Sequence, residues 1–156
     1  MSRPLESLLG EVPFFSGLAE DDLALVAGCG SNVHFDVGEN LFRTGDTADA
    51  FYVIRHGSVA LETFVPARGA VVIETIESGE VIGWSWLFAP YRWHLDARAL
   101  TAVRATAFDG VCLRQKCDSD PRLGYDLMSR FAQVVIERLQ WTRLRLLDVY
   151  GDSNRS

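Results

Sequence analysis

Histidines and cysteines are the side chains best suited to hold a metal ion, and their spacing argues against a metal site. The histidines are His34, His56 and His94. They contain no His-x-His pair, which a metal-dependent barrel enzyme would need together with a carboxylate and a further histidine. The cysteines are Cys29, Cys112 and Cys117. Their number is odd and their spacing fits no zinc or iron–sulfur site, so we expect free or buried thiols in a reducing compartment.

Nucleophilic catalysis has equally little support in the sequence. Asp46 and Asp49 lie close together, but they stand in a Gly/Asp-rich segment where aspartates cap the local backbone. The sequence contains no Gly-x-Ser-x-Gly elbow and no Walker loop. We therefore expect a protein that is not an enzyme and has no metal.

Three glycine-bearing turns and one aromatic cluster are the strongest candidates for a binding site. The turns lie at residues 35–46, 54–59 and 79–83. Because glycine adopts a positive φ without steric cost, each predicts a tight turn or a close backbone approach. After the third turn, five aromatic residues occur within ten: Trp84, Trp86, Phe88, Tyr91 and Trp93. These rings could stack on a base or fill a pocket, and the sequence leaves both open.

The elements that must position these turns are mostly short strands. Residues 4–9 and 18–27 are expected to form short helices. From about residue 31, runs rich in Val, Ile, Phe and Thr recur at regular intervals. The predicted strands include 51–54, 59–64, 71–76, 97–107 and 111–114. Such a series predicts an antiparallel sandwich or barrel.

The last segment changes to a helical period. Ser119 or Asp120 can cap a helix that begins with Pro121, and Gly124 is a candidate break between a short helix and a long one. Beyond Met128, these residues recur at steps of three and four: Phe131, Val135, Leu139, Thr142, Leu146 and Val149. The alternatives are a helix that lies on its own barrel and a helix shared with a second copy of the chain. The heptad spacing favours a homodimer.

Composition limits the partners and the location. The chain has 156 residues, of which 48% are hydrophobic and 23% charged, as in one folded domain. Its net charge of −6 opposes nonspecific binding to DNA or to an anionic membrane surface. No stretch approaches the ~20 apolar residues of a membrane-spanning helix, and the N-terminus makes a poor signal peptide. We expect a cytoplasmic protein with neither a DNA nor a membrane partner.

The order of the motifs resembles the cyclic-nucleotide-binding domain family. The matching segments are 12–18, Gly38-Glu39, Gly45-Asp46, 51–54, Gly57-Ser58-Val59 and 138–142. The resemblance covers about residues 10–149. It implies one mainly β domain over 1–156, an eight-stranded antiparallel jelly roll (double-stranded β-helix) with flanking helices. The expected parts are N-terminal helices in 1–30, the roll in 31–116 and C-terminal helices, one of them long, in 117–150.

The resemblance also implies a ligand site. In this family a phosphate-binding cassette begins Gly-Glu and leads into a short helix whose N–H groups meet a cyclic phosphate. Here Gly79 and Glu80 match the opening, and Glu80 is the expected partner of the ribose 2′-OH. The residues expected to follow it in the site are Val81, Ile82, Gly83, Trp84 and Ser85. In the long helix, Thr142 is the expected base contact, and Arg143 takes the place of a neighbour that reaches the partner subunit's ligand.

One position departs from the family pattern. Counting back from Arg98 and Ala99 places Trp93 where the family has its phosphate-binding arginine, and His94 follows it. Arg92 lies one residue too early, which on a strand would turn its side chain to the other face. From a loop it could still reach, so Arg92 is the expected phosphate ligand, with Trp93 beside it. Arg98 is the alternative.

The resemblance implies a stand-alone sensor. We expect it to bind cyclic AMP, cyclic GMP or a related small ligand, without another cofactor, and to signal to a partner protein through its C-terminal helix. No helix-turn-helix follows the long helix in this sequence, consistent with the expected absence of DNA binding. The alternative is a nucleotide-free interaction or scaffold module whose pocket is closed by its own aromatic residues.

Overall fold

Eight antiparallel strands form two four-stranded sheets in the computed structural model, which describes residues 5–153. Sheet A has the order β1 (Gly30–Phe35), β8 (Val103–Asp109), β3 (Ala50–His56) and β6 (Val81–Ile82). Sheet B has the order β2 (Asn40–Phe42), β7 (Asp96–Ala99), β4 (Val59–Val65) and β5 (Gly69–Ile76). This arrangement confirms the predicted eight-stranded antiparallel roll, although the two sheets do not close into one barrel.

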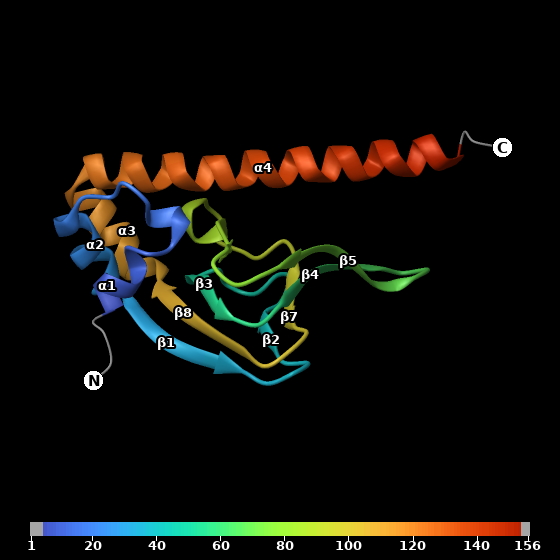
Figure 1. Ribbon diagram of the computed structural model, residues 1–156, viewed down its shortest axis with the longest axis horizontal. Coiled ribbons are helices and arrows are strands. Elements are labelled where there is room, and N and C mark those ends of the chain that lie inside the picture. The colour runs from blue at the N-terminus through green and yellow to red at the C-terminus, as the bar shows by residue number, and fades with distance from the viewer. Residues whose placement is uncertain (1–4, 154–156) are drawn as a thin grey trace.

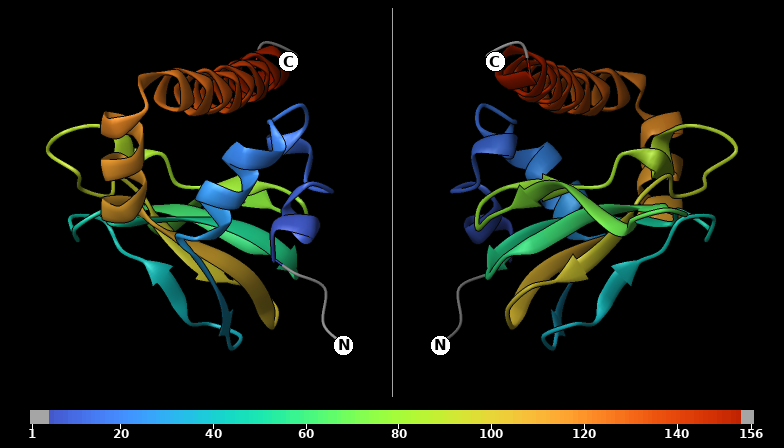
Figure 2. Two further views of the ribbon diagram at one scale, coloured as in Figure 1. Left: turned by 90° about the vertical axis from the view of Figure 1, so that its left-hand side faces the viewer. Right: turned by 90° about the vertical axis from the view of Figure 1, so that its right-hand side faces the viewer.

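Helices gather at one end of the roll. They are α1 (Leu5–Leu9), the 3₁₀ turn η1 (Pro13–Phe15), α2 (Glu20–Ala27), the 3₁₀ turn η2 (Ser85–Leu87) of the cassette and α3 (Gly110–Ser119). The long helix α4 (Pro121–Ser153) runs across all of them and continues past the roll towards the β4–β5 hairpin (Figure 1). Seen from the sides, α4 forms a separate layer above the sheets (Figure 2). None of the helices within residues 5–153 is long and apolar enough to cross a membrane.

Strand alternation divides the buried side chains into two cores. Phe51 and Val53 of β3 lie in the core between sheet A and the helices, whereas Ile54 lies in the core between the two sheets. The helix-side core also holds the aromatic rings of Phe108 and Phe131. Sheet A is therefore covered on both faces along part of its length, and α4 is anchored to it by Phe131.

The start of α4 follows the predicted capping pattern. Pro121 is its first residue, and the backbone N–H of Leu123 donates to Asp120 Oδ1 at 3.4 Å. Asp120 is thus the cap. The predicted break at Gly124 is wrong, because α4 runs through that residue, which packs against Cys117.

The predicted strand over 111–114 is also wrong. These residues belong to α3, whose first turn is capped by Asp109: its Oδ1 accepts from the backbone N–H of Cys112 at 3.0 Å. The strands of the roll therefore end at Asp109, earlier than the expected limit of 116.

A disulfide joins Cys29 to Cys112, so the expectation of free thiols is wrong for this pair. Gly30 pairs with Phe108, and the N–H of Asp109 donates to the carbonyl of Cys29 at 2.9 Å. The β1–β8 ladder thus brings together two cysteines that are 83 residues apart in sequence. Cys117 is the free cysteine in the described chain, and burial raises the pKa of its thiol.

Reduction of the Cys29–Cys112 bond should lower the melting temperature. A link across 83 residues restricts the unfolded chain, and such bonds contribute about 2–4 kcal/mol. Thermal unfolding with and without a dithiol reductant measures the effect. Cys117→Ser is the control and should respond to reductant as the wild type does, whereas Cys112→Ser should not respond. A reductant-insensitive wild type would contradict the prediction.

Candidate functional site

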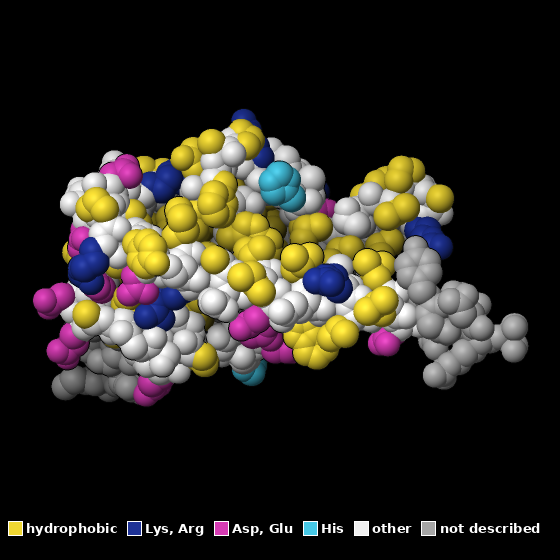
Figure 3. Space-filling model, turned by 90° about the horizontal axis from the view of Figure 1, so that it is seen from above, with side chains coloured by type: hydrophobic (Ala, Val, Ile, Leu, Met, Phe, Trp, Pro, Cys, Tyr) yellow, Lys and Arg dark blue, Asp and Glu magenta, His cyan; other side chains and the backbone are white. Residues whose placement is uncertain are grey.

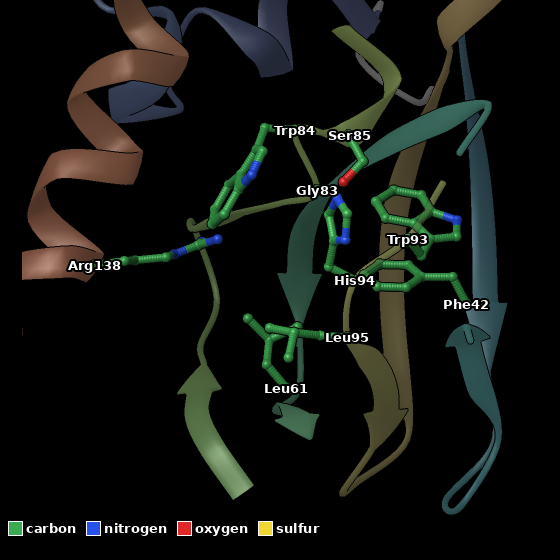
Figure 4. Close-up of a pocket in the computed structure, with 9 residues that line it drawn as sticks. All are labelled: Phe42, Leu61, Gly83, Trp84, Ser85, Trp93, His94, Leu95 and Arg138. Atoms are coloured by element: carbon green, nitrogen blue, oxygen red, sulfur yellow. The ribbon is translucent and has the colours of Figure 1, made fainter. Parts of the chain in front are cut away.

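A hollow of about 100 Å³ lies between the two ends of the segment that joins β6 to β7, beside α4. Figure 4 shows the side chains that line it. They are Phe42, Leu61, Gly83, Trp84, Ser85, Trp93, His94, Leu95 and Arg138. Most of these groups are apolar, and Arg138 is the charged group among them. We call this hollow the cassette pocket.

Trp93 closes the inner end of the cassette pocket. Its side chain is buried and stacks on Phe42, with ring centroids 3.7 Å apart and planes at 10°. The backbone holds it there, since Trp93 N–H donates to the carbonyl of Asp46 at 3.0 Å and its carbonyl accepts from Gly45 at 2.9 Å. The indole also lies against Gly83, where a Cβ atom would come within 2.7 Å of the ring. Gly83 has a φ of +94°, so both its conformation and its contact require glycine.

Arg138 reaches the cassette from α4. One guanidinium nitrogen donates to the carbonyl of Val81, and Nε lies 3.5 Å from Glu74 Oε2. The guanidinium carbon also lies 5.2 Å from the centroid of the Trp84 ring, a cation–π contact. Only 11% of the Arg138 side chain is exposed.

Burial opposes charge on both members of the Arg138–Glu74 pair. It is the largest cause of a lowered pKa at Arg138, with nearby glutamates acting in the opposite direction. It is also the largest cause of a raised pKa at Glu74, against the attraction of Arg138. An arginine in a protein stays protonated even when it is buried. The pocket wall therefore carries a positive charge, which contacts one carboxylate, one carbonyl and one aromatic ring.

Glu80 does not line the cassette pocket. Its Oε1 accepts from the backbone N–H of Glu77 at 3.1 Å, which closes the turn between β5 and β6. It lines a separate hollow of about 190 Å³, where Gly79, Trp141 and Arg138 are among its neighbours. The side chain of Arg138 is common to the two hollows.

Neither candidate arginine of the cassette lines the pocket. Arg92 Nη1 donates to the carbonyl of Gly45 at 3.3 Å and to Thr47 Oγ1 at 3.2 Å, so it ties the cassette to the loop before β3. Arg98 lies on β7 and forms a two-pronged ion pair with Glu62, at 2.9 and 3.1 Å. The structure therefore does not bring Glu80 and Arg92 together across one cavity.

The remaining predicted residues divide into three groups. Gly83, Trp84, Ser85 and Trp93 meet at the cassette pocket. Val81 and Ile82 are buried in β6. Thr142 and Arg143 are exposed on the part of α4 that follows Arg138. Thr142 Oγ1 donates to the carbonyl of Arg138 at 2.9 Å.

Sequence reasoning missed Arg138 as a site residue. The spacing could have indicated it, because Arg138 lies one helical turn before the predicted base contact Thr142 and so on the same face of the helix. The resemblance had assigned the ligand contacts to the later turn. Within residues 5–153, no group of three or more His, Cys, Asp or Glu side chains could hold a metal ion.

Comparison with protein families gives a match over residues 32–120 to the model described as "Cyclic nucleotide-binding domain". A solved structure from Geobacter metallireducens GS-15, described as a candidate cyclic nucleotide-binding protein, superposes with a TM-score of 0.78. It is 28% identical in sequence, and the match covers 89% of this chain and 99% of that one.

Two curated proteins contain a similar segment. A cAMP-dependent protein kinase regulatory subunit of Schizosaccharomyces pombe is 30% identical over 104 residues, which are 67% of this chain and 24% of that protein. Glutaminase 1 of Bradyrhizobium diazoefficiens is 28% identical over 133 residues, which are 84% of this chain and 21% of that protein. The chain thus spans about a quarter or less of the curated relatives it matches.

Gly83→Ala should destabilise the fold more than Gly38→Ala does. Both glycines have a positive φ, +94° and +89°, but a Cβ meets nothing within 4 Å at Gly38 and meets the Trp93 ring at Gly83. The backbone strain of about 1 kcal/mol or more is common to both, and the contact adds to it only at Gly83. Thermal unfolding measures the difference, and tryptophan fluorescence should shift to the red only in Gly83→Ala. Equal losses of stability would show that Trp93 does not depend on this contact.

Proposed function

This chain belongs to the cyclic nucleotide-binding domain family, and we propose that it is a non-enzymatic regulatory domain that binds a small ligand in the cassette pocket. We propose further that the bound ligand acts on α4, through which the domain signals to a partner protein. The family membership and the position of the pocket support a ligand-binding role.

The observation that carries the proposal is the position of Arg138. It belongs to α4, yet its guanidinium lies in the pocket wall and bonds to the carbonyl of Val81. An anionic group entering the pocket would compete for this guanidinium with Val81 and Glu74, because hydrogen bonds between ions are the stronger kind. If the guanidinium exchanges Val81 or Glu74 for the ligand, a bond that holds α4 against the cassette is lost. Ligand binding therefore shifts the equilibrium between the positions of α4 with and without that bond.

The lining suggests the chemistry of the ligand. Trp84 and Trp93 offer flat rings, and Arg138 offers one positive charge, so the favoured ligand has a flat ring and a negative group. Cyclic AMP and cyclic GMP, the ligands expected from the sequence, have both. Pockets for drug-sized molecules measure about 300–1,000 Å³, well above the 100 Å³ found here. A cyclic nucleotide would therefore enter only after Trp93 moves away from Phe42.

The stack of Trp93 on Phe42 favours a second function, a nucleotide-free interaction module. In that case the two rings close the pocket permanently, and the cassette serves to hold α4. The two functions differ in one measurable property, which is whether a ligand of this class binds at all.

Arg138→Gln should weaken ligand binding, with a panel of cyclic AMP, cyclic GMP and indole-3-acetate as probes. We expect saturable calorimetric binding of at least one probe to the wild type. The substitution should cost about 1.5–3 kcal/mol, the contribution of a hydrogen bond to a charged group. Arg143→Gln is the matched control, because Arg143 is exposed on the same helix. Thermal unfolding shows whether each variant is folded.

Two outcomes would contradict this proposal. If no probe binds the wild type at millimolar concentration, the interaction module is the better description. If a probe binds and Arg143→Gln weakens it while Arg138→Gln does not, the ligand contacts lie on the later turn of α4.

We also propose that α4 joins two copies of the chain. Its exposed side chains include a row of apolar residues at steps of three, seven or eight: Tyr125, Met128, Ile136, Leu139 and Leu146. Figure 3 looks down on α4 and shows hydrophobic side chains gathered along it. Contiguous apolar surface of this kind is typical of an interaction site. Phe131, part of the expected seam, is buried against its own domain, and the side chain of Val149 lies outside the described residues.

Leu139→Asp should convert a dimer into a monomer. Leu139 is 57% exposed in the single chain, so the aspartate should leave the monomer folded but place an unpaired charge in the dimer seam. Light scattering coupled to size exclusion measures the mass. Gln140→Asp, at the exposed neighbouring position, adds the same charge and should remain dimeric. A wild type that is monomeric at micromolar concentration would overturn the dimer.

A further inference from the structure

The outer face of sheet A carries a cluster of cations at the end of the strands remote from the helices. On β3 the residues Phe51 and Val53 face the helix-side core, and the next residue in this alternation is Arg55. On β8 Phe108 faces the same core, and the alternation leads back through Thr106 to Arg104. Figure 1 shows that β8 begins far from α3 and ends against it. Arg55 and Arg104 therefore extend the outer face beyond the region that the helices cover.

These residues line a hollow of about 540 Å³ together with His56 and Ala102. The strands β3 and β8 are hydrogen-bonded neighbours, and His56 is in register with Arg104. His34 of β1 is in register with Arg104 on its other side. The volume lies within the ~300–1,000 Å³ of small-molecule sites, and the hollow shares no lining residue with the cassette pocket.

The cations of this hollow lack partners in the described part of the chain. Neither Arg55 nor Arg104 forms an ion pair or a side-chain hydrogen bond there, and Arg55 Nη1 is buried without an acceptor. Buried donors almost always have an acceptor. Other arginines of the described chain also lack a carboxylate, such as Arg92 and Arg114, but their guanidiniums donate to backbone carbonyls, whereas the buried Nη1 of Arg55 has no acceptor.

The backbone is also irregular at this point. The register of β3 against β8 shifts between Ile54 and His56, so that Arg55 is the extra residue of a β-bulge. A bulge re-aims the side chain that it carries, and bulges are over-represented beside functional sites. This observation is independent of the missing acceptor, and both concern Arg55.

We propose that the hollow formed by Arg55, His56 and Arg104 binds a small molecule through its phosphate group. A guanidinium pairs with two phosphate oxygens at once, and two guanidiniums on neighbouring strands suit the two negative charges of a phosphate monoester. The imidazole of His56 supplies one further donor. The phosphate replaces the missing acceptor of Arg55, and the bound molecule occupies the rest of the hollow.

Backbone amide chemical shifts measured during titration test this site. The probes are inorganic phosphate and glucose 6-phosphate, with sodium chloride at matched ionic strength as the reference. We expect saturable shifts confined to residues 55–58 and 102–104, and tighter binding of the sugar phosphate if a monoester is the ligand. Arg104→Gln, an exposed position that should fold normally, is expected to weaken binding at least about tenfold. Arg55→Gln should do the same.

Arg68→Gln is the matched control, since Arg68 is exposed in the β4–β5 turn and should leave binding unchanged. Equal shifts with sodium chloride, or an equal loss in Arg68→Gln, would overturn the site. Inorganic phosphate binding as tightly as the sugar phosphate would identify the free anion as ligand. Shifts in residues 83–95 report the cassette pocket instead, so the failure of one site is distinguishable from the failure of the other.

Discussion

A buried guanidinium must find partners, and in this protein that requirement determines how the long helix meets the roll. Removing Arg138 from water is costly unless its donors are satisfied. The acceptors come from two elements far away in sequence, the carbonyl of Val81 and the carboxylate of Glu74, with the ring of Trp84 beside them. Because these groups have fixed positions on β5, β6 and the turn after β6, α4 has one favourable placement over the cassette. Phe131 strengthens the same placement from the helix-side core.

The roll matches the family, but the pocket inside the cassette has a largely apolar lining. The family match and the superposition describe the roll, whereas the pocket within it is lined mainly by aromatic and aliphatic groups. Trp93 takes the interior position, and the arginines nearby bond to Gly45 and Glu62 instead. A side chain of this size replaces solvent that a smaller pocket lining would admit, so the cassette contributes to the stability of the roll.

The sequence predicted most of the fold because local signals and the fold agree. The roll was predicted from runs of apolar residues separated by glycine turns. The start of α4 was predicted from the pair Asp120 and Pro121. The prediction for 111–114 failed because a short apolar run resembles a strand, while the cap at Asp109 and the packing of Leu113 make the segment helical.

The site was less predictable, because it depends on contacts between distant residues. Glu80 was assigned from a two-residue motif that here serves a turn. Arg138 meets Val81 across 57 residues, a relation that no local spacing contains. In the same way, the disulfide between Cys29 and Cys112 arises from strand pairing and not from a cysteine motif.

The stack of Trp93 on Phe42 has a consequence for the speed of recognition. Under the proposed function, a ligand larger than the closed pocket would enter only while the indole is turned out, so each association event would wait for a rearrangement of a packed ring. The observed on-rate would then level off at high ligand concentration, at the frequency with which the ring opens. Dissociation would be slowed by the same barrier. Such a domain would average over brief changes in ligand level and respond only to lasting ones.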